Sequence, residues 1–156
     1  ERFSKIGSKA NLLDVSLPAI LDNIVSYTKQ RIPKTKKIDI LSNYPDNLNI
    51  KGDEVLLGWA FENLIKNSIQ AIEGDSGKIE IDVRQSLDRT SILFTDTGKG
   101  ISRADWNKVF SPGYSTKSRG WGVGLSLTKR IIQETHSGKI RIQKSSKQGT
   151  SVEILI

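Results

Sequence analysis

Apolar residues recur at a spacing of three to four positions in several segments of the chain, and this spacing predicts helices. The first helix covers about 16–31, with Ser16 as its N-cap and a proline in its first turn. The second covers 53–72, with Asp53 in the N-cap position after a glycine. A third follows the glycine-rich run at 120–124 and ends at Gly138, which is predicted to be its C′ residue. Segment 102–110 predicts a short helix.

Six other segments alternate apolar and polar residues, as half-buried strands do. They are 37–43, 48–51, 78–85, 90–95, 139–144 and 151–156. A short loop at 87–89 joins the third of these strands to the fourth, and a turn at 147–149 joins the last two. Each of these pairs therefore predicts a β-hairpin.

The second predicted helix has two distinct faces. Its core face is apolar and consists of Leu57, Phe61, Leu64, Ile65 and Ile72. Asn63, Asn67 and Gln70 share another face, although Asn is a poor helix former. Plain solvent exposure explains this pattern, and so does a hard divalent cation that is bound by amide oxygens and carries phosphate oxygens. Glu62 and Lys66 predict a surface ion pair.

The glycine-rich run at 120–124 leads directly into the third predicted helix. Free N–H groups and the positive end of the helix dipole favour phosphate at such a helix start, and glycine lets the backbone approach it closely. The spacing is GxGxG after a polar loop, so the run is neither a Walker loop nor a dinucleotide fingerprint. From the glycines alone, a phosphate site and a flexible loop both remain open.

Asp96 stands where the fourth predicted strand ends, and Gly98 and Gly100 follow it. A carboxylate at this position would project at the sheet edge, where it could accept a hydrogen bond from an adenine amino group. An Asp-Thr-Gly turn is the structural alternative. His136, the only histidine, is predicted to be a helix-end cation that interacts with the helix dipole.

Composition narrows the class of protein. The 156 residues, with 36% hydrophobic and 26% charged, are typical of one globular domain. The absence of cysteine excludes disulfides and cysteine metal sites, and no apolar run approaches membrane length, so we expect no membrane contact by this domain and a cytoplasmic location. Whether the parent protein is membrane-anchored stays open. The net charge of +7 is scattered along the chain without a basic stripe, so no nucleic acid is expected as a partner.

Four sequence motifs and a final glycine–threonine pair occur in one order, and together they resemble the ATP-binding catalytic domain of sensor histidine kinases, in the gyrase, Hsp90, histidine kinase and MutL ATPase superfamily. The resemblance covers about 16–156. The matching motifs are NLIKNSIQAI at 63–72 (asparagine box), DTGKGI at 96–101 (first glycine box), VFSPGYSTK at 109–117 (phenylalanine box and lid), GWGVGL at 120–125 (second glycine box) and the glycine–threonine pair at 149–150.

The resemblance implies a role for each matched residue. Asn67 would coordinate Mg²⁺ that bridges the ATP phosphates, and Asn63 would support the phosphate or metal contacts. Asp96 would accept a hydrogen bond from the adenine amine, Thr150 would support the hydrogen bonds on the adenine side, and Lys117 would approach the phosphates. The remaining implied site residues are Gly98 and Gly100 in the adenine pocket, Phe110 as the lid anchor, and Gly120, Gly122 and Gly124 at the phosphate-binding helix start.

The implied fold is α+β, a two-layer α/β sandwich in which a mixed sheet carries about three helices on one face, known as the Bergerat ATP-binding fold. The implied reaction is transfer of the ATP γ-phosphoryl group to a histidine on a separate dimerisation domain of the parent protein, with a response regulator as the downstream partner. Residues 1–10 resemble only the end of the helical hairpin that carries such a histidine, so 11–156 is expected to be an excised catalytic domain.

Two alternatives stay open: an ATPase or protein-serine kinase of the same superfamily, and a nucleotide-sensing module without catalysis. The hydrolysing members of the superfamily place a catalytic Glu four residues before the metal-binding Asn. That position is Asn63 in this chain, and Glu62 is one residue away from it. The pattern therefore favours phosphoryl transfer over hydrolysis.

Overall fold

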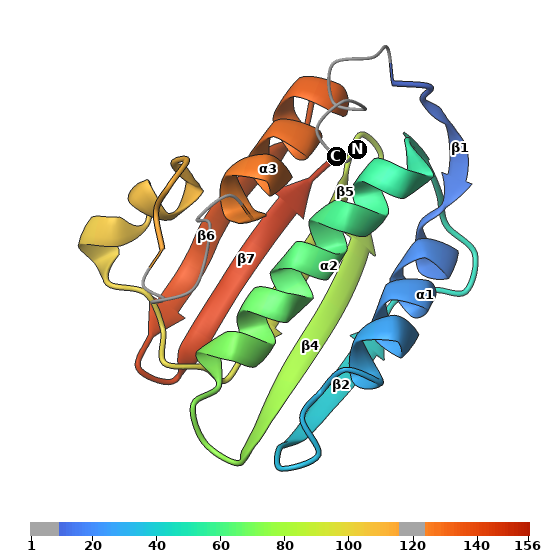
Figure 1. Cartoon of the computed structure of the whole chain (residues 1–156). Helices are drawn as coiled ribbons and strands as arrows, with labels where there is room; N and C mark the ends of the chain where they lie inside the picture. Colours follow the sequence, from blue (N-terminus) through green and yellow to red (C-terminus); the bar gives the residue numbers. More distant parts are fainter. Residues whose placement is uncertain (1–9, 116–123) are drawn as a thin grey trace.

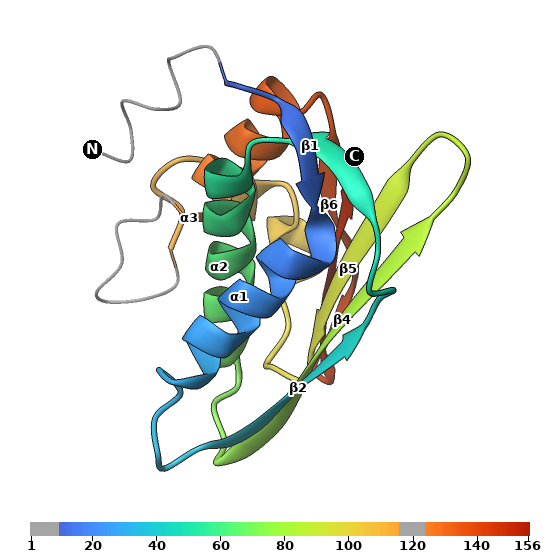
Figure 2. The ribbon, with the colours of Figure 1, turned by 90° about the vertical axis from the view of Figure 1, so that its right-hand side faces the viewer.

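The molecule is built on a five-stranded sheet that carries a layer of helices on one face (Figure 1). The computed structural model describes residues 10–115 and 124–156. The strand order is β2-β4-β5-β7-β6, with β2 parallel to β4 and the other neighbours antiparallel. Figure 2 shows the layers edge-on, with α1 and α2 on the same side of the sheet. The predicted α/β sandwich with a mixed sheet is confirmed.

The strands of the main sheet agree with the alternating segments of the sequence. They are β2 (Lys37–Asn43), β4 (Ser76–Gln85), β5 (Thr90–Asp96), β6 (Lys139–Ser146) and β7 (Gly149–Leu155). Both predicted hairpins form, β4 with β5 and β6 with β7. The short strand β3 (Asn49–Gly52) pairs instead with β1 (Leu13–Ser16), a strand that the sequence pattern did not indicate.

The first two helices start at the predicted caps. The Ser16 side chain accepts a hydrogen bond from the Ala19 N–H at 3.3 Å, at the start of α1 (Leu17–Lys29). The Asp53 carboxylate accepts from two N–H groups at 3.0 Å, at the start of α2 (Glu54–Ala71). These helices and the sheet share one core, whose fully buried side chains include Leu17, Leu21, Leu57, Phe61, Ile65, Ile79, Ile81, Ile92, Phe94 and Ile154.

The third helix ends differently from the prediction. Its first part, α3 (Gly124–Arg130), is α-helical, and it continues as a π-helical turn, η4 (Ile131–Thr135). Gly138 was predicted to be the C′ residue, but His136 is the C-cap and Ser137, with a left-handed φ of 53°, takes the C′ position. Gly138 is required for another reason: a Cβ there would lie 2.5 Å from the carbonyl oxygen of Leu155.

Segment 102–110 forms two short 3₁₀ helices in place of the one predicted helix, η2 (Arg103–Asp105) and η3 (Lys108–Phe110). Ser102 makes no side-chain capping hydrogen bond. The Trp106 indole N–H donates to the Ile101 carbonyl oxygen at 3.0 Å and ties this segment to the end of the first glycine box. None of the helices in the described ranges has the combined length and hydrophobicity of a membrane span.

Candidate functional site

Helix α2 carries the predicted asparagine stripe beside the core. Packing of Phe61 against Phe94, with ring centroids 5.7 Å apart, holds α2 over β5. Asn63 and Asn67 are half-buried, whereas the apolar face of the same helix is fully enclosed. The Asn63 amide N–H donates to the carbonyl oxygen of Gly124 at 3.4 Å. The stripe therefore faces the start of α3.

Asp96 is the last residue of β5, and its side chain is only 7% exposed. Burial raises the pKa of this carboxyl group above its ordinary value, because desolvation disfavours the charged form. Hydrogen bonds from the Gly98 N–H, the Ser68 hydroxyl and the backbone of Thr150 lower the pKa and offset part of this rise. The Gly98 bond measures 2.8 Å. Asp96 is thus a buried, oriented acceptor.

The loop after Asp96 is fastened to the C-terminal end of α2. The Lys99 N–H donates to the Ala71 carbonyl oxygen at 2.9 Å. A Cβ on Gly98 would lie 2.6 Å from the Ala71 Cβ, so only glycine fits between the loop and the helix. Ser68, which contacts Asp96, directly follows Asn67 on α2. This arrangement brings the asparagine stripe and the buried carboxylate together.

A second loop closes on Asp96 from the other side. Gly149, with a φ of 139°, approaches so closely that a Cβ would lie 1.8 Å from the Asp96 carbonyl oxygen. Gly100, with a φ of 83°, lies against the carbonyl group of Ser146 in the same way, with a Cβ position 1.9 Å from its oxygen. Gly100 of the first glycine box and Gly149 of the glycine–threonine turn therefore each contact the opposite segment.

Ser145 connects these two loops, and the sequence patterns gave no indication of it. Its hydroxyl oxygen accepts a hydrogen bond from the Ile101 N–H at 2.7 Å and lies 2.8 Å from the Thr150 hydroxyl oxygen. Thr150 itself is buried at 6% exposure and pairs with Asp96 in the sheet. Ser68 was also missed, because a serine on a helix face carries no signal until its neighbours are known.

The lid side of the site is described only in part. Phe110 is buried at the end of η3, which packs against α3. Gly124 opens α3, next to Asn63. The predicted residues Lys117, Gly120 and Gly122 lie outside the described residues.

The donor set at the stripe suits a metal that is held mainly by phosphate and water. No cluster of three or more His, Cys, Asp or Glu in the described ranges could hold a metal by itself. Mg²⁺ needs no such cluster, because it usually keeps several waters and takes one or two protein oxygens together with substrate phosphates. The amide oxygens of Asn63 and Asn67 are hard donors of this kind.

His136 is not the helix-end cation that the sequence predicted. Its ring is buried at 8% exposure, and desolvation lowers its pKa. One ring nitrogen, Nε2, accepts from the Asp53 N–H at 3.0 Å, and the other, Nδ1, lies 2.8 Å from the Ile131 carbonyl oxygen. A neutral imidazole satisfies both contacts, so His136 is a structural link between helix ends.

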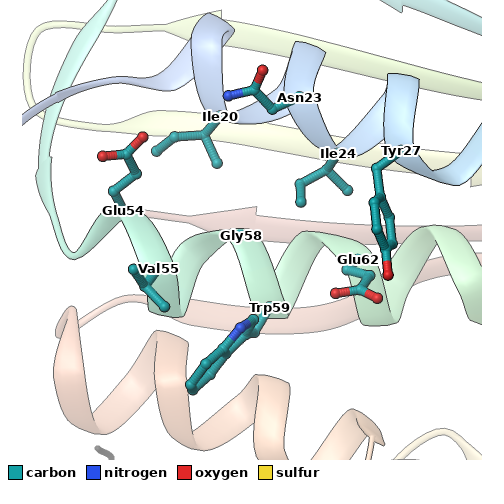
Figure 3. Close-up of a pocket in the computed structure, with 9 residues that line it drawn as sticks. All are labelled: Ile20, Asn23, Ile24, Tyr27, Glu54, Val55, Gly58, Trp59 and Glu62. Atoms are coloured by element: carbon teal, nitrogen blue, oxygen red, sulfur yellow. The ribbon is translucent and has the colours of Figure 1, made fainter. Parts of the chain in front are cut away.

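A separate groove of about 410 Å³ lies between α1 and α2 (Figure 3). It is lined by Ile20, Asn23, Ile24, Tyr27, Glu54, Val55, Gly58, Trp59 and Glu62. Glu62 therefore lines the groove beside α1, whereas the neighbouring Asn63 contacts α3. Within the described part of the chain Glu62 forms no ion pair, so the predicted pair with Lys66 is absent.

Comparison with known proteins gives a consistent result. The pattern that defines the histidine kinase-, DNA gyrase B- and HSP90-like ATPase family matches residues 52–156. Sporulation kinase B of Bacillus subtilis (strain 168) is 36% identical over 119 residues, which are 76% of this chain and 28% of that kinase. The chain spans less than a third of the length of the curated relatives compared, at 28%, 18% and 30% for sporulation kinases B, A and C.

Solved structures agree with the sequence comparison. The catalytic domain of histidine kinase ThkA, in a nucleotide-free form, superposes with a TM-score of 0.83 at 25% identity, covering 94% of this chain and 97% of that one. Histidine kinase ThkA in complex with the response regulator protein TrrA has the same fold, with a TM-score of 0.77 at 22% identity, covering 93% of this chain and 41% of that one.

Proposed function

Because the chain belongs to the histidine kinase-, DNA gyrase B- and HSP90-like ATPase family, we propose that it binds Mg-ATP and donates the γ-phosphoryl group to a histidine on a separate dimerisation domain. The observation that carries this proposal is the buried carboxylate of Asp96, which lies between α2 and the β6–β7 turn. A buried, oriented carboxylate of this kind supports a site that accepts a hydrogen bond from a donor group of the ligand. The histidine kinases among the relatives support transfer to histidine.

Asp96 accepts the adenine amino group in this proposal. The Gly98 N–H and the Ser68 hydroxyl hold the carboxylate in one orientation, so that a lone pair remains for the base. Gly98 and Gly100 shape the pocket for the base, because the absence of a Cβ lets their loop pack closely against Ala71 and Ser146. Thr150 supplies a hydroxyl on the adenine side, and Ser145 positions that hydroxyl.

Asn63 and Asn67 hold the triphosphate end. Asn67 would ligate Mg²⁺, with Asn63 beside it, and the bound ion would neutralise charge on the phosphate oxygens. Gly124 and the N–H groups at the start of α3 face the same region and favour anionic oxygens. We assign Lys117, Gly120 and Gly122 to phosphate contacts and Phe110 to lid anchoring, from their match to the family motifs.

The chain provides positioning and charge stabilisation, and the partner domain provides the nucleophile. During transfer the bond between the γ-phosphorus and the bridging oxygen breaks, a bond to an imidazole nitrogen forms, and ADP leaves. His136 is unsuited as the acceptor because both of its ring nitrogens are already in hydrogen bonds. The acceptor therefore comes from outside residues 11–156, which we assign as the catalytic domain.

Phosphoryl transfer is favoured over hydrolysis by the position of Glu62. A hydrolytic member would need a general base near the attacking water, but the residue four positions before Asn67 is an amide, and Glu62 lines the α1–α2 groove. The complex of ThkA with its response regulator supports a response regulator as the downstream partner here. We infer a cytoplasmic location, where ATP is available.

The test is incubation of the chain with γ-labelled ATP and Mg²⁺, with and without a histidine-bearing helical hairpin from the parent protein. We expect acid-labile label on the hairpin and none on the chain alone, and Asp96→Asn should strongly reduce the label on the hairpin. Label on His136 would contradict the proposal. Nucleotide binding without any label on the hairpin would indicate a sensing module, and release of inorganic phosphate without the hairpin would indicate an ATPase.

A further inference from the structure

The α1–α2 groove is outside the proposed nucleotide site and is available for another ligand. Tyr27 and Val55 line it and belong to the exposed large apolar residues of the described ranges, at 41% and 42% exposure. Half-buried Ile24 and buried Gly58 lie between them and form the floor of the groove (Figure 3). An exposed apolar groove between two helices is the kind of surface into which an amphipathic helix packs.

Gly58 is the most informative residue of the groove. Glycine in mid-helix destabilises the helix by roughly 0.5–1 kcal/mol relative to alanine. At Gly98 and Gly138 a Cβ would lie within 2.6 Å of other atoms, so the fold itself demands glycine. At Gly58 the closest atom would be Ile24 Cδ1 at 3.7 Å, an ordinary contact, and the backbone is not left-handed. The fold would accept alanine at this position. We therefore attribute the glycine to the groove, which a Cβ would make shallower.

Two carboxylates flank this glycine. Glu54 and Glu62 precede and follow Gly58 by four residues, so they lie on one stripe of α2 and about 12 Å apart along the axis. Neither forms an ion pair with any residue that the structure describes, although the chain has a net charge of +7. Glu54 is favourably placed at the helix start, but Glu62 in mid-helix has no such role.

We propose that the α1–α2 groove binds an amphipathic, basic helix of a separate regulatory protein. The apolar face of that helix would pack over Gly58 between Ile24 and Val55, and Lys or Arg residues about two turns apart would face Glu54 and Glu62. The groove lies on the α1 side of α2, whereas Asn63 faces α3. The partner helix would therefore lie away from the phosphate end of the nucleotide site and leave ATP free to bind. This position suits a regulator and not a phosphoacceptor, whose histidine must reach the γ-phosphate.

The probe for this surface is a helical peptide of about 15 residues, with leucines on one face and lysines on the other. We expect saturable binding to the chain that weakens with salt. Gly58→Ala should raise the unfolding temperature by about 2–4 °C and weaken peptide binding at least about fivefold, because the methyl group fills the groove. If Gly58 were needed only for the fold, Gly58→Ala would lower the unfolding temperature, so higher stability together with weaker peptide binding identifies a role in the groove. Glu62→Gln should weaken binding about two- to fivefold.

Matched controls separate the groove from general charge effects. A peptide with glutamates in place of the lysines should not bind. Gly74→Ala is the glycine control, because a Cβ at this position would meet nothing within 4 Å. Glu134→Gln is the charge control, because it removes an exposed carboxylate that lies outside the groove. Both variants should leave peptide binding unchanged.

Four outcomes would overturn the proposal. Equal peptide affinity for the wild-type chain and Gly58→Ala would place binding elsewhere. Competition between peptide and ATP would contradict a groove apart from the nucleotide site. Self-association that Gly58→Ala abolishes, measured by sedimentation, would assign the groove to a second copy of the chain. Tight binding of a peptide from the parent protein's own hairpin, lost in Gly58→Ala, would assign it to that hairpin.

Discussion

The Nε2 atom of His136 accepts a hydrogen bond from the backbone N–H of Asp53, 83 residues earlier, at 3.0 Å. Asp53 caps α2, and His136 follows η4, the continuation of α3. The second ring nitrogen is engaged with the Ile131 carbonyl oxygen. One buried imidazole therefore joins the two helices that flank the proposed phosphate site, and it must be neutral to do so.

This contact predicts a dependence of stability on pH. Because burial lowers the pKa of His136 in the folded chain, the unfolded chain binds a proton first as pH falls. The stabilisation is complete above the unfolded pKa of about 6.5 and is lost as pH falls from there towards the folded pKa. Urea unfolding between pH 8 and 5 should show this decline, and His136→Gln should flatten it. A wild-type profile that is flat below pH 6.5 would contradict the prediction.

The sequence could not reveal this contact. A histidine near a helix end suggested interaction with the helix dipole, since only local spacing is visible in a sequence. Its true partner comes from the N-cap of another helix. By contrast, the cap itself was predictable, because an Asp before an apolar periodic segment satisfies N–H groups within its own next three residues.

The Asp96 carboxylate should make the nucleotide-free chain less stable at neutral pH. Its folded pKa is raised, mainly by desolvation, so its contribution to stability is present below the unfolded pKa of about 3.9 and is lost as pH rises through the folded value. Asp96→Asn removes this penalty. We expect thermal unfolding of the variant at pH 7 to occur at or above the wild-type temperature.

The same substitution should remove selective adenine binding. Loss of a charge-assisted hydrogen bond costs roughly 1.5–3 kcal/mol, and the wild type should prefer ATP over GTP, whose guanine presents a carbonyl where Asp96 needs a donor. Calorimetric titration with both nucleotides measures this. Equal affinity for ATP and GTP, or unchanged ATP affinity in Asp96→Asn, would contradict the adenine assignment.

Asn67 should act on the metal and phosphates more than on folding. It lies on the half-buried stripe and outside the apolar face of α2, so Asn67→Ala should reduce Mg²⁺-dependent ATP affinity while the unfolding temperature changes little. Lys66→Ala, at the exposed neighbouring position, is the matched control and should leave metal dependence unchanged. A drop of several kcal/mol in unfolding free energy with normal metal-dependent binding would mean that Asn67 is a packing residue.

Sequence reasoning found the glycines of the site for a physical reason and missed its serines for another. Gly98, Gly100 and Gly149 occupy positions where a Cβ would collide or where φ is positive. Such positions require glycine, so they can be recognised in the sequence. Ser68 and Ser145 act only through residues that folding brings near. Serine is common on helix faces and in strand ends, so its identity alone predicts nothing.

The contact between Ser145 and Thr150 yields a prediction about how the adenine side is organised. The Ser145 oxygen accepts from the Ile101 N–H at 2.7 Å, and its own proton has two possible acceptors, the Thr150 hydroxyl at 2.8 Å and the Gly149 carbonyl oxygen at 3.4 Å. The shorter contact favours Thr150. The Thr150 hydroxyl proton is then directed away from Ser145, as a donor towards the bound base or a water beside it.

If this orientation matters, Ser145→Ala and Thr150→Val should each weaken ATP binding and should not add in the double variant, with a coupling of about 0.5–3 kcal/mol. Ser86→Ala is the matched control, because Ser86 makes a comparable hydrogen bond in the β4–β5 loop, away from the site. The affinities for ATP and for an analogue without the adenine amine separate this role from that of Asp96, since the loss in Ser145→Ala should persist with the analogue. Additive losses, or full ATP affinity in Ser145→Ala, would show that Ser145 only closes the loop and does not set the donor direction of Thr150.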